Sequence, residues 1–294
     1  MAEIESPQYG FPIVLEEEGL AANVYADLHN QRIKLLDYTG KVEGLPGKLI
    51  LLCKKYRLGK VICTIPERSI TNFLDAGYLE EGMMDGYFKG VKGYCLSYFA
   101  DKKRLVSKNT DEEDRIVRKA NEVKNQFVFR QSSFQVRTAL PDDADSVANL
   151  FKEVFKTYPT PMDNPDYIKK VMGEHVLFKV ALADGKLVST ASADIDPQML
   201  HAEITDCATL PEYRGQGLLS QLVYHLEQEL SAKGFKTFYS LSRALSGGIN
   251  IVLSKHGYTY SGRLVNNCNI MGTFEDMNIW VKSMVQIAYP NKAR

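Results

Sequence analysis

The stretch Leu210-Pro-Glu-Tyr-Arg-Gly-Gln-Gly-Leu-Leu-Ser220 is the most informative part of this sequence. A strand-like segment, His201 to Leu210, leads into it, and an amphipathic helix is predicted from about Gly217 to Lys233. A turn that contains glycines and leads into a helix points unpaired backbone N–H groups outward, and the helix dipole favours a negative ligand. Glycine is needed because a side chain would block the approach of that ligand. The stretch therefore predicts an anion-binding loop between a strand and a helix.

Strand and helix patterns alternate on both sides of this loop. Hydrophobic periodicity predicts helices at 141–158, 166–172, 217–233 and 250–256. It predicts strands at 134–139, 176–183, 186–194, 201–210, 236–242, 258–270 and 277–284. Together these elements indicate a mixed α/β (α+β) domain in which helices cover one sheet.

The run Arg214-Gly-Gln-Gly217, between that strand and that helix, resembles the pyrophosphate-binding signature of the GNAT superfamily of N-acetyltransferases, Arg/Gln-x-x-Gly-x-Gly/Ala. The resemblance implies a GNAT fold for the C-terminal half and acetyl-CoA as co-substrate. It implies that the CoA pyrophosphate is bound by Arg214, Gly215, Gln216, Gly217, Leu218, Leu219 and Ser220. It also implies that Ala208, Thr209 and Leu210 lie along the pantetheine arm, on a strand that splays from its neighbour and offers free backbone groups. Leu219 departs from the family pattern, which usually has Gly or Ala there.

An acetyltransferase must also remove a proton from its acceptor amine, whose unperturbed pKa is about 10.4. A carboxylate acting directly or through water is the usual base. The run Ala202-Glu-Ile-Thr-Asp-Cys-Ala208 resembles the same strand of histone-type GNAT enzymes, whose catalytic glutamate aligns with Glu203. Strand alternation predicts Glu203 on one face and Asp206 on the other. Glu203 is the first candidate base; the alternative is that it is only an exposed glutamate of the strand. Asp206 is the second candidate, either as the base or as a partner of the substrate ammonium.

Many GNAT enzymes carry a tyrosine general acid four residues before the glycine of a Gly-Phe or Gly-Tyr pair. The pair here is Gly257-Tyr258, and the matching position is Leu253. That tyrosine is therefore missing, and either another group or solvent would protonate the thiolate. Asn250, on the same predicted helix, is a candidate for contact with the thioester region.

The whole chain resembles the β-lysine N6-acetyltransferases. The resemblance is carried by Val154-Phe-Lys-Thr-Tyr-Pro-Thr-Pro161, by the run from Ala202 to Gly217, and by the segment from Gly262 to Trp280. It implies acetylation of β-lysine to the compatible solute N6-acetyl-β-lysine. The candidate residues for binding this acceptor are Tyr158, Asp194, Asp206 and Asn267. For Asp194 and Asp206, the alternative is that the carboxylate is a solvated charge on the surface.

The sequence indicates two domains, at 1–130 and 131–294. A charged segment, 101–126, predicts a linker helix, or alternatively a surface helix of the first domain, and Thr110 to Glu113 have capping-box spacing. Before it, a helix at 45–58, a strand at 60–65, a helix at 69–79 and a strand pair at 87–99 are predicted. This order echoes the second half of the C-terminal domain. The first domain is interpreted as a smaller α/β domain, either a degenerate GNAT-like half or an unrelated fold.

Composition narrows the classes of partner. The 36 basic and 36 acidic side chains balance, which argues against nucleic acid. The first residues, MAEIESPQ, are not a signal peptide, and apolar runs are too short to span a membrane. Five scattered cysteines and five scattered histidines predict neither disulfides nor a metal and suit a reducing cytoplasm. The expected partner is a small-molecule amine; the oligomeric state stays open, a homodimer included.

Three other functions compete with β-lysine acetylation. The first is a GNAT enzyme for another amine, such as lysine, a polyamine or a protein lysine. The second is a non-catalytic acyl-CoA sensor, suggested by Leu219 and by the missing tyrosine at Leu253. The third is a protein-interaction module, because the N-terminal half shows no site chemistry. Turnover of acetyl-CoA with a panel of amines separates these functions.

Overall fold

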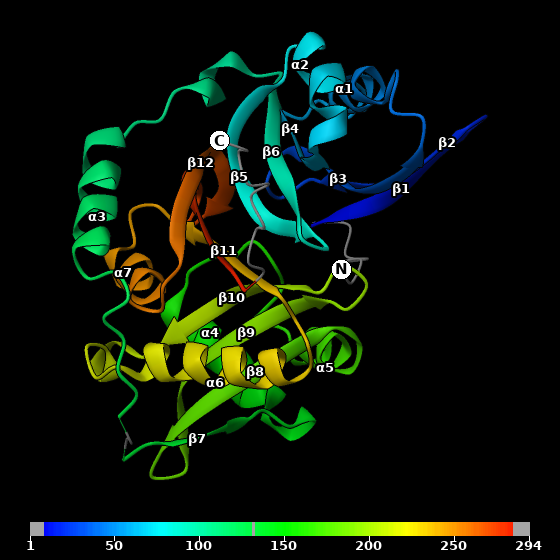
Figure 1. Cartoon of the computed structure of the whole chain (residues 1–294). Coiled ribbons are helices and arrows are strands. Elements are labelled where there is room, and N and C mark those ends of the chain that lie inside the picture. Colours follow the sequence, from blue (N-terminus) through cyan, green and yellow to red (C-terminus); the bar gives the residue numbers. More distant parts are fainter. Residues whose placement is uncertain (1–8, 131–132, 285–294) are drawn as a thin grey trace.

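The computed structural model describes residues 9–130 and 133–284, so the expectation about a signal peptide falls on residues outside the described part. These residues form one curved sheet with the strand order β1-β2-β3-β4-β6-β5-β12-β13-β11-β10-β9-β8-β7 (Figure 1). No helix in the described part of the chain is long and apolar enough to cross a membrane. The expected mixed α/β class is confirmed.

The C-terminal half contains the predicted alternation of strands and helices. Its elements are β7 (Gln135–Thr138), α4 (Ala144–Val154), α5 (Pro165–Glu174), β8 (Val176–Ala183), β9 (Lys186–Asp196), β10 (His201–Thr209), α6 (Leu218–Ala232), β11 (Thr237–Arg243), α7 (Gly247–Lys255), β12 (Thr259–Ile270) and β13 (Thr273–Ser283). The helix α6 packs on β8, β9 and β10, and α4 packs on β9 and β10 (Figure 1). The apolar stripe of α6, which includes Leu222, Leu226 and Leu230, is fully buried and therefore holds the helix on the sheet.

The N-terminal half contains three strands that the sequence patterns did not reveal. Its elements are β1 (Gly10–Glu17), β2 (Leu20–Asp27), β3 (Arg32–Gly40), α1 (Leu45–Lys55), β4 (Lys60–Pro66), α2 (Ile70–Asp75), β5 (Leu79–Phe88) and β6 (Val91–Phe99). The prediction of a helix at 69–79 was too long, because α2 ends at Asp75 and β5 begins at Leu79. In β2 and β3 one face carries polar side chains such as Asn23 and Lys34 that line a cavity, which weakened the apolar pattern.

The two halves repeat the same strand order. The order β1-β2-β3-β4-β6-β5 matches β8-β9-β10-β11-β13-β12, and the two sets meet where β5 lies beside β12. The register repeats as well, because β3 pairs in parallel with β4, and β10 with β11, through three residues each. Lys34 is the third of these residues in β3 and Glu203 is the third in β10, so the two occupy equivalent positions. The described residues contain no N-terminal counterpart of β7, α4 and α5. This repeat supports the interpretation of the first half as a degenerate GNAT-like half.

Two glycines allow the halves to join. Gly82 of β5 pairs with Gly262 of β12, and each lies beside a register shift within its own hairpin. A methyl group at Gly262 would lie 2.2 Å from the carbonyl oxygen of Glu81 and 2.5 Å from the Cα of Gly82. The backbones therefore approach at this point more closely than any side chain would permit.

We expect Gly262→Ala to lower the free energy of unfolding by about 2 kcal/mol, because the methyl group overpacks the junction at a φ of 144°. Gly272→Ala is the control, since it also has a positive φ, 85°, but its methyl group would meet no atom within 4 Å. Chemical denaturation of both variants measures the difference. Equal losses would show that backbone strain, and not close contact between the halves, determines the effect.

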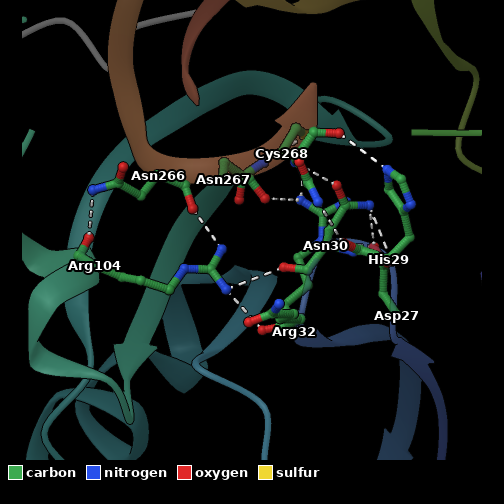
Figure 2. Close-up of polar contacts among 10 residues, drawn as sticks. Asp27, His29, Asn30, Arg32, Arg104, Asn266, Asn267 and Cys268 are labelled. Atoms are coloured by element: carbon green, nitrogen blue, oxygen red, sulfur yellow. Dashed lines mark hydrogen bonds and ion pairs between the residues drawn. The ribbon is translucent and has the colours of Figure 1, made fainter. Parts of the chain in front are cut away.

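A network of polar side chains also joins the halves (Figure 2). The guanidinium of Arg104 donates hydrogen bonds to the carbonyls of Asn30, Gln31 and Asn266. Arg32 donates to the Asp27 carboxylate at 2.8 Å and to the carbonyl of Asn267 at 2.9 Å. These contacts hold the C-terminal part of β12 against the N-terminal half.

The helix α3 (Thr110–Glu122), in the charged segment, packs against α7 on the outside of the molecule (Figure 1). The predicted capping box is wrong, because Asn109 is the N-cap residue and its side chain forms no capping hydrogen bond. The Glu113 carboxylate instead accepts a hydrogen bond from Ser107 and pairs with Arg263 at 3.2 Å. The buried Glu113 side chain therefore contributes to the tertiary contact with β12 and does not cap α3.

Candidate active site

The glycine-containing turn before α6 has the geometry of an anion-binding loop. Gly215 and Gly217 adopt left-handed φ values of 77° and 78°, and a methyl group at either would meet no atom within 4 Å. The first hydrogen bond of the helix runs from the Gln221 N–H to the Gly217 carbonyl. Leu218 and Leu219, whose N–H groups precede that bond, border a large cavity. Because the first turn of α6 carries no acidic side chain, the site suits the pyrophosphate of a CoA ester.

The expected cofactor residues differ in how they face this cavity. Gly215, Gly217, Leu218, Leu219, Ser220, Arg214 and Thr209 border it. The exposed Gln216 binds the Glu212 carbonyl, and Ala208 and Leu210 are buried in the core, so these three do not border it. Arg214 donates from Nε to the Thr209 carbonyl at 3.2 Å, which ties the loop to the end of β10.

The strands β10 and β11 part at the centre of the cavity. They pair only from His201 to Glu203, opposite Thr237 to Tyr239. Beyond Glu203, β10 continues along β9 and β11 continues along β13. This is the expected splay, and it exposes backbone groups of β10 that could pair with an extended amide chain.

Glu203 and Asp206 both border the cavity. The Asp206 carboxylate accepts a hydrogen bond from Ser192, which pairs with Thr205 on the face of Glu203, so the prediction of opposite faces is wrong. A β-bulge between Thr205 and Ala208 breaks the alternation, and Asp206 adopts a φ of 46°. The bulge inserts an extra residue and thereby turns a side chain to the other face. Both candidate bases consequently lie beside the opening between β10 and β11.

The cavity raises the pKa of both carboxylic acids. Burial is the main cause, and it raises the pKa of Glu203 to about 7 against the opposing effects of the Lys34 charge and a hydrogen bond from Tyr239. Burial raises the pKa of Asp206 to about 6, although Ser192 donates a hydrogen bond to it at 2.8 Å. A base that titrates near neutral pH is well matched to proton transfer.

The expected acceptor residues gather around these carboxylates. Tyr158 hydrogen-bonds to Asp206, and Asp194 lies 3.8 Å from the His175 ring nitrogen. Asn267 borders the cavity and has a buried side-chain oxygen that accepts no hydrogen bond within the described residues. Burial raises the pKa of Asp194, because its charge is partly removed from water.

Asn250 has a structural role, which corrects its assignment to the thioester region. Its side chain is fully buried and donates to the carbonyls of Arg243 and Ser246. Its amide oxygen accepts hydrogen bonds from Asn278 and Trp280. Since these contacts occupy the amide, Asn250 fixes α7 against β13 and does not border the cavity.

Sequence reasoning missed several residues of the cavity. Tyr87 of β5 stacks on His201 with ring centroids 4.1 Å apart, and it hydrogen-bonds to Tyr239. Lys34 of β3 borders the same space, which has a volume of about 1460 Å³. No local motif marks either residue. Lys34 lies in β3, which the sequence patterns did not reveal, so no sequence signal directed attention to it.

Comparison with known proteins agrees with this geometry. Residues 144–246 match the Acetyltransferase (GNAT) family. The chain is 35% identical to a protein of Methanosarcina mazei called beta-lysine N(6)-acetyltransferase, over 85% of this chain and 100% of that protein. It is 35% identical to N-acetyltransferase YodP of Bacillus subtilis, over 92% of this chain and 98% of the relative. The ribosomal-protein-S18-alanine N-acetyltransferase from Escherichia coli is 18% identical, with a TM-score of 0.46 over 55% of this chain and 99% of its own.

The anion-binding loop, the splayed strands and the two cavity carboxylates define an enzyme of the acyltransferase class. The chain belongs to the GNAT family of N-acetyltransferases.

Proposed function

We propose that this enzyme transfers the acetyl group of acetyl-CoA to the N6 amine of β-lysine. The observation that carries the proposal is the placement of Glu203 and Asp206, both with raised pKa values, at the opening between β10 and β11. The relative from Methanosarcina mazei, which this chain covers in full, bears the name of that activity. Acetyl-CoA would be held by the loop at Gly215 and Gly217 and would supply the acetyl group.

The cavity suits an acceptor with two ammonium groups. Glu203, Asp206 and Asp194 all border it, and their negative charges can neutralise such a molecule. In the proposed reaction the Glu203 carboxylate takes a proton from the N6 ammonium. The neutral nitrogen then attacks the thioester carbonyl carbon, and the C–S bond breaks as the amide forms. The second N–H proton of the nitrogen passes through solvent to the leaving CoA thiolate, and Glu203 returns its own proton to solvent. Asp206 binds the ammonium and is held by Ser192 and Tyr158.

Three further statements belong to this proposal. The product is a compatible solute for osmoadaptation, as the resemblance implies. The enzyme acts in the cytoplasm, which agrees with free cysteines at 53, 63, 95, 207 and 268. The chain divides near residue 130 into two domains, a division supported by the repeated strand order although one sheet joins them.

We expect β-lysine to be used with a kcat/KM at least about 10-fold higher than α-lysine. Moving one ammonium group by a single carbon leaves a carboxylate partner in the cavity unpaired, which costs binding in the transition state. Release of CoA thiol with each amine, and mass spectrometry of the acetylated product, measure the preference. Equal values would assign the chain to a less selective amine acetyltransferase.

A further inference from the structure

His256 contacts the anion-binding loop before α6 through the hydroxyl of Ser220. Ser220 lies in the first turn of α6 and borders the cavity beside Gly217 and Leu218. Its Oγ lies 2.7 Å from Nε2 of His256, which is the C-cap residue of α7. The His256 side chain is only 1% exposed. A buried histidine is therefore hydrogen-bonded to a hydroxyl at the edge of the candidate pyrophosphate site.

Two other contacts fix the imidazole ring. Phe127, in the segment after α3, stacks on the His256 ring with ring centroids 3.9 Å apart. The Phe127 N–H donates to the Lys255 carbonyl at 3.1 Å, which holds that segment against the end of α7. Nδ1 of the imidazole lies 3.6 Å from the Glu227 carboxylate of α6. The ring consequently has a fixed orientation, with Nε2 toward Ser220 and Nδ1 toward Glu227.

The neighbours of the ring determine which nitrogen carries a proton. Burial acts to raise the pKa of Glu227, but its contacts with His256 and Lys282 outweigh burial and lower that pKa, so the carboxylate is ionised. Since an ionised carboxylate only accepts hydrogen bonds, Nδ1 faces Glu227 as an N–H group. Nε2 of the neutral ring is then an acceptor, and the Ser220 hydroxyl donates its proton to it.

The charge of His256 therefore sets the direction of the Ser220 hydroxyl. With a neutral ring, the hydroxyl proton is held by Nε2, and only lone pairs of Oγ are left for an incoming phosphate. With a protonated ring, Nε2–H donates to Oγ, and the hydroxyl proton is free to bind a phosphate oxygen. This change of direction requires one proton from solvent.

The charges around the ring favour that proton when an anion is present. Glu227 already pairs with Lys282 at 2.8 Å, so a protonated His256 adds an uncompensated cation to a buried site. Lys255 borders the cavity, and burial keeps the pKa of Tyr258 well above its usual value, so that hydroxyl stays neutral. The C-terminus of α7 favours a cation at His256, and a bound pyrophosphate supplies the missing negative charge.

We propose that His256 is a positioning residue for acetyl-CoA, which takes up a proton as the pyrophosphate binds and so directs the Ser220 hydroxyl toward a phosphate oxygen. This inference rests on the proposed function, because it takes the loop at Gly217 as the site of acetyl-CoA, but it does not depend on the acceptor amine. Binding of acetyl-CoA strengthens as the pH falls through the titration of His256, because proton and ligand raise each other's affinity by the same factor.

The test measures proton uptake on binding, by isothermal titration calorimetry in two buffers that differ in their enthalpy of ionisation. The ligand is 3′-dephospho-CoA, which keeps the pyrophosphate and lacks the 3′-phosphate, a group with a pKa of about 6. At neutral pH we expect the wild-type protein to take up as much as about one proton more than His256→Gln, whose amide does not titrate. His225→Gln, on α6 and outside the cavity lining, is the matched control and should keep the wild-type uptake.

A pair of substitutions separates the bond to Ser220 from the packing of the ring. The amide of glutamine lies near the Nε2 position and donates to the Ser220 oxygen, whereas that of asparagine lies near Nδ1 and reaches only Glu227. We expect His256→Gln to bind dephospho-CoA within about 3-fold of the wild type, and His256→Asn to bind it about 10-fold more weakly. Ser220→Ala should abolish the proton uptake without disturbing the buried ring, which keeps the test available should a histidine variant fold poorly.

Two results would overturn the inference. The first is equal proton uptake in the wild type and in His256→Gln. The second is an equal loss of affinity in His256→Gln and His256→Asn, which would show that the ring acts only by packing against Phe127. Should dephospho-CoA bind too weakly, acetyl-CoA replaces it, because the titration of its 3′-phosphate cancels between wild type and variant. A wild-type protein that binds neither ligand would refute the proposed function itself, so the two failures are distinguishable.

Discussion

Gly217→Asp is expected to weaken acetyl-CoA binding by about 10³-fold or more. The new carboxylate would lie where the free N–H groups of Leu218 and Leu219 meet the pyrophosphate, so two like charges would be brought together. An aspartate would also have to adopt the left-handed φ of 78°. Isothermal titration calorimetry of the folded variant measures the dissociation constant.

Two controls separate charge from backbone strain. Gly217→Asn has nearly the same shape as the aspartate and tolerates a positive φ, so its loss of affinity should be much smaller. Gly185→Asp introduces the same residue at a φ of 80° in the β8–β9 turn, where a methyl group would meet no atom within 4 Å. Unchanged affinity in Gly217→Asp would disprove the assignment of the loop to the pyrophosphate.

Glu203→Gln is expected to lower kcat/KM by about 10²- to 10³-fold at neutral pH, because it keeps the shape of the side chain and removes the proton acceptor. The sign of the pH dependence follows from the pKa. Glu203 works as a carboxylate, so with a pKa of about 7 the wild-type rate falls as the pH drops below 7. This acidic limb should vanish in Glu203→Gln, and the deficit should shrink as the pH approaches the pKa of the amine.

Asp206→Asn is the matched comparison on the same strand. If Asp206 only binds the substrate ammonium, its replacement should chiefly raise KM and leave the limb near pH 7 in place. Burial raises the pKa of Asp206 as it raises that of Glu203, so the two variants, and not the position of the limb, identify which acid titrates. A profile in which Asp206→Asn loses the acidic limb while Glu203→Gln keeps it would make Asp206 the base.

The anion-binding loop and the C-terminal fold could be predicted from the sequence because their determinants are local. The left-handed φ values of Gly215 and Gly217 and the free N–H groups of α6 depend on residues within one turn of helix. The alternation of apolar residues likewise reported the strands and helices around the loop. The candidate base Glu203 came from a resemblance in one short strand, and the structure places it in the cavity.

Other features depend on residues far apart in the chain, and there the local patterns failed. The bulge in β10 brings Asp206 to the side of Glu203, which strict alternation could not foresee. Asn250 looked like a ligand contact until Asn278 and Trp280 were seen to occupy its amide. Both outcomes are set by partners on other strands, because pairing register and buried hydrogen bonds are tertiary properties.

The sequence by itself therefore determined the family and indicated a candidate loop for the CoA ester and a candidate base, since each is encoded within a few consecutive residues. Only the tertiary structure decided that the N-terminal half repeats the strand order of the C-terminal half. Only it decided that Lys34 and Glu203, far apart in the chain, border one cavity. The physical reason is that the contact between Gly82 and Gly262 closes the two sheets into one, and that closure brings distant strands together.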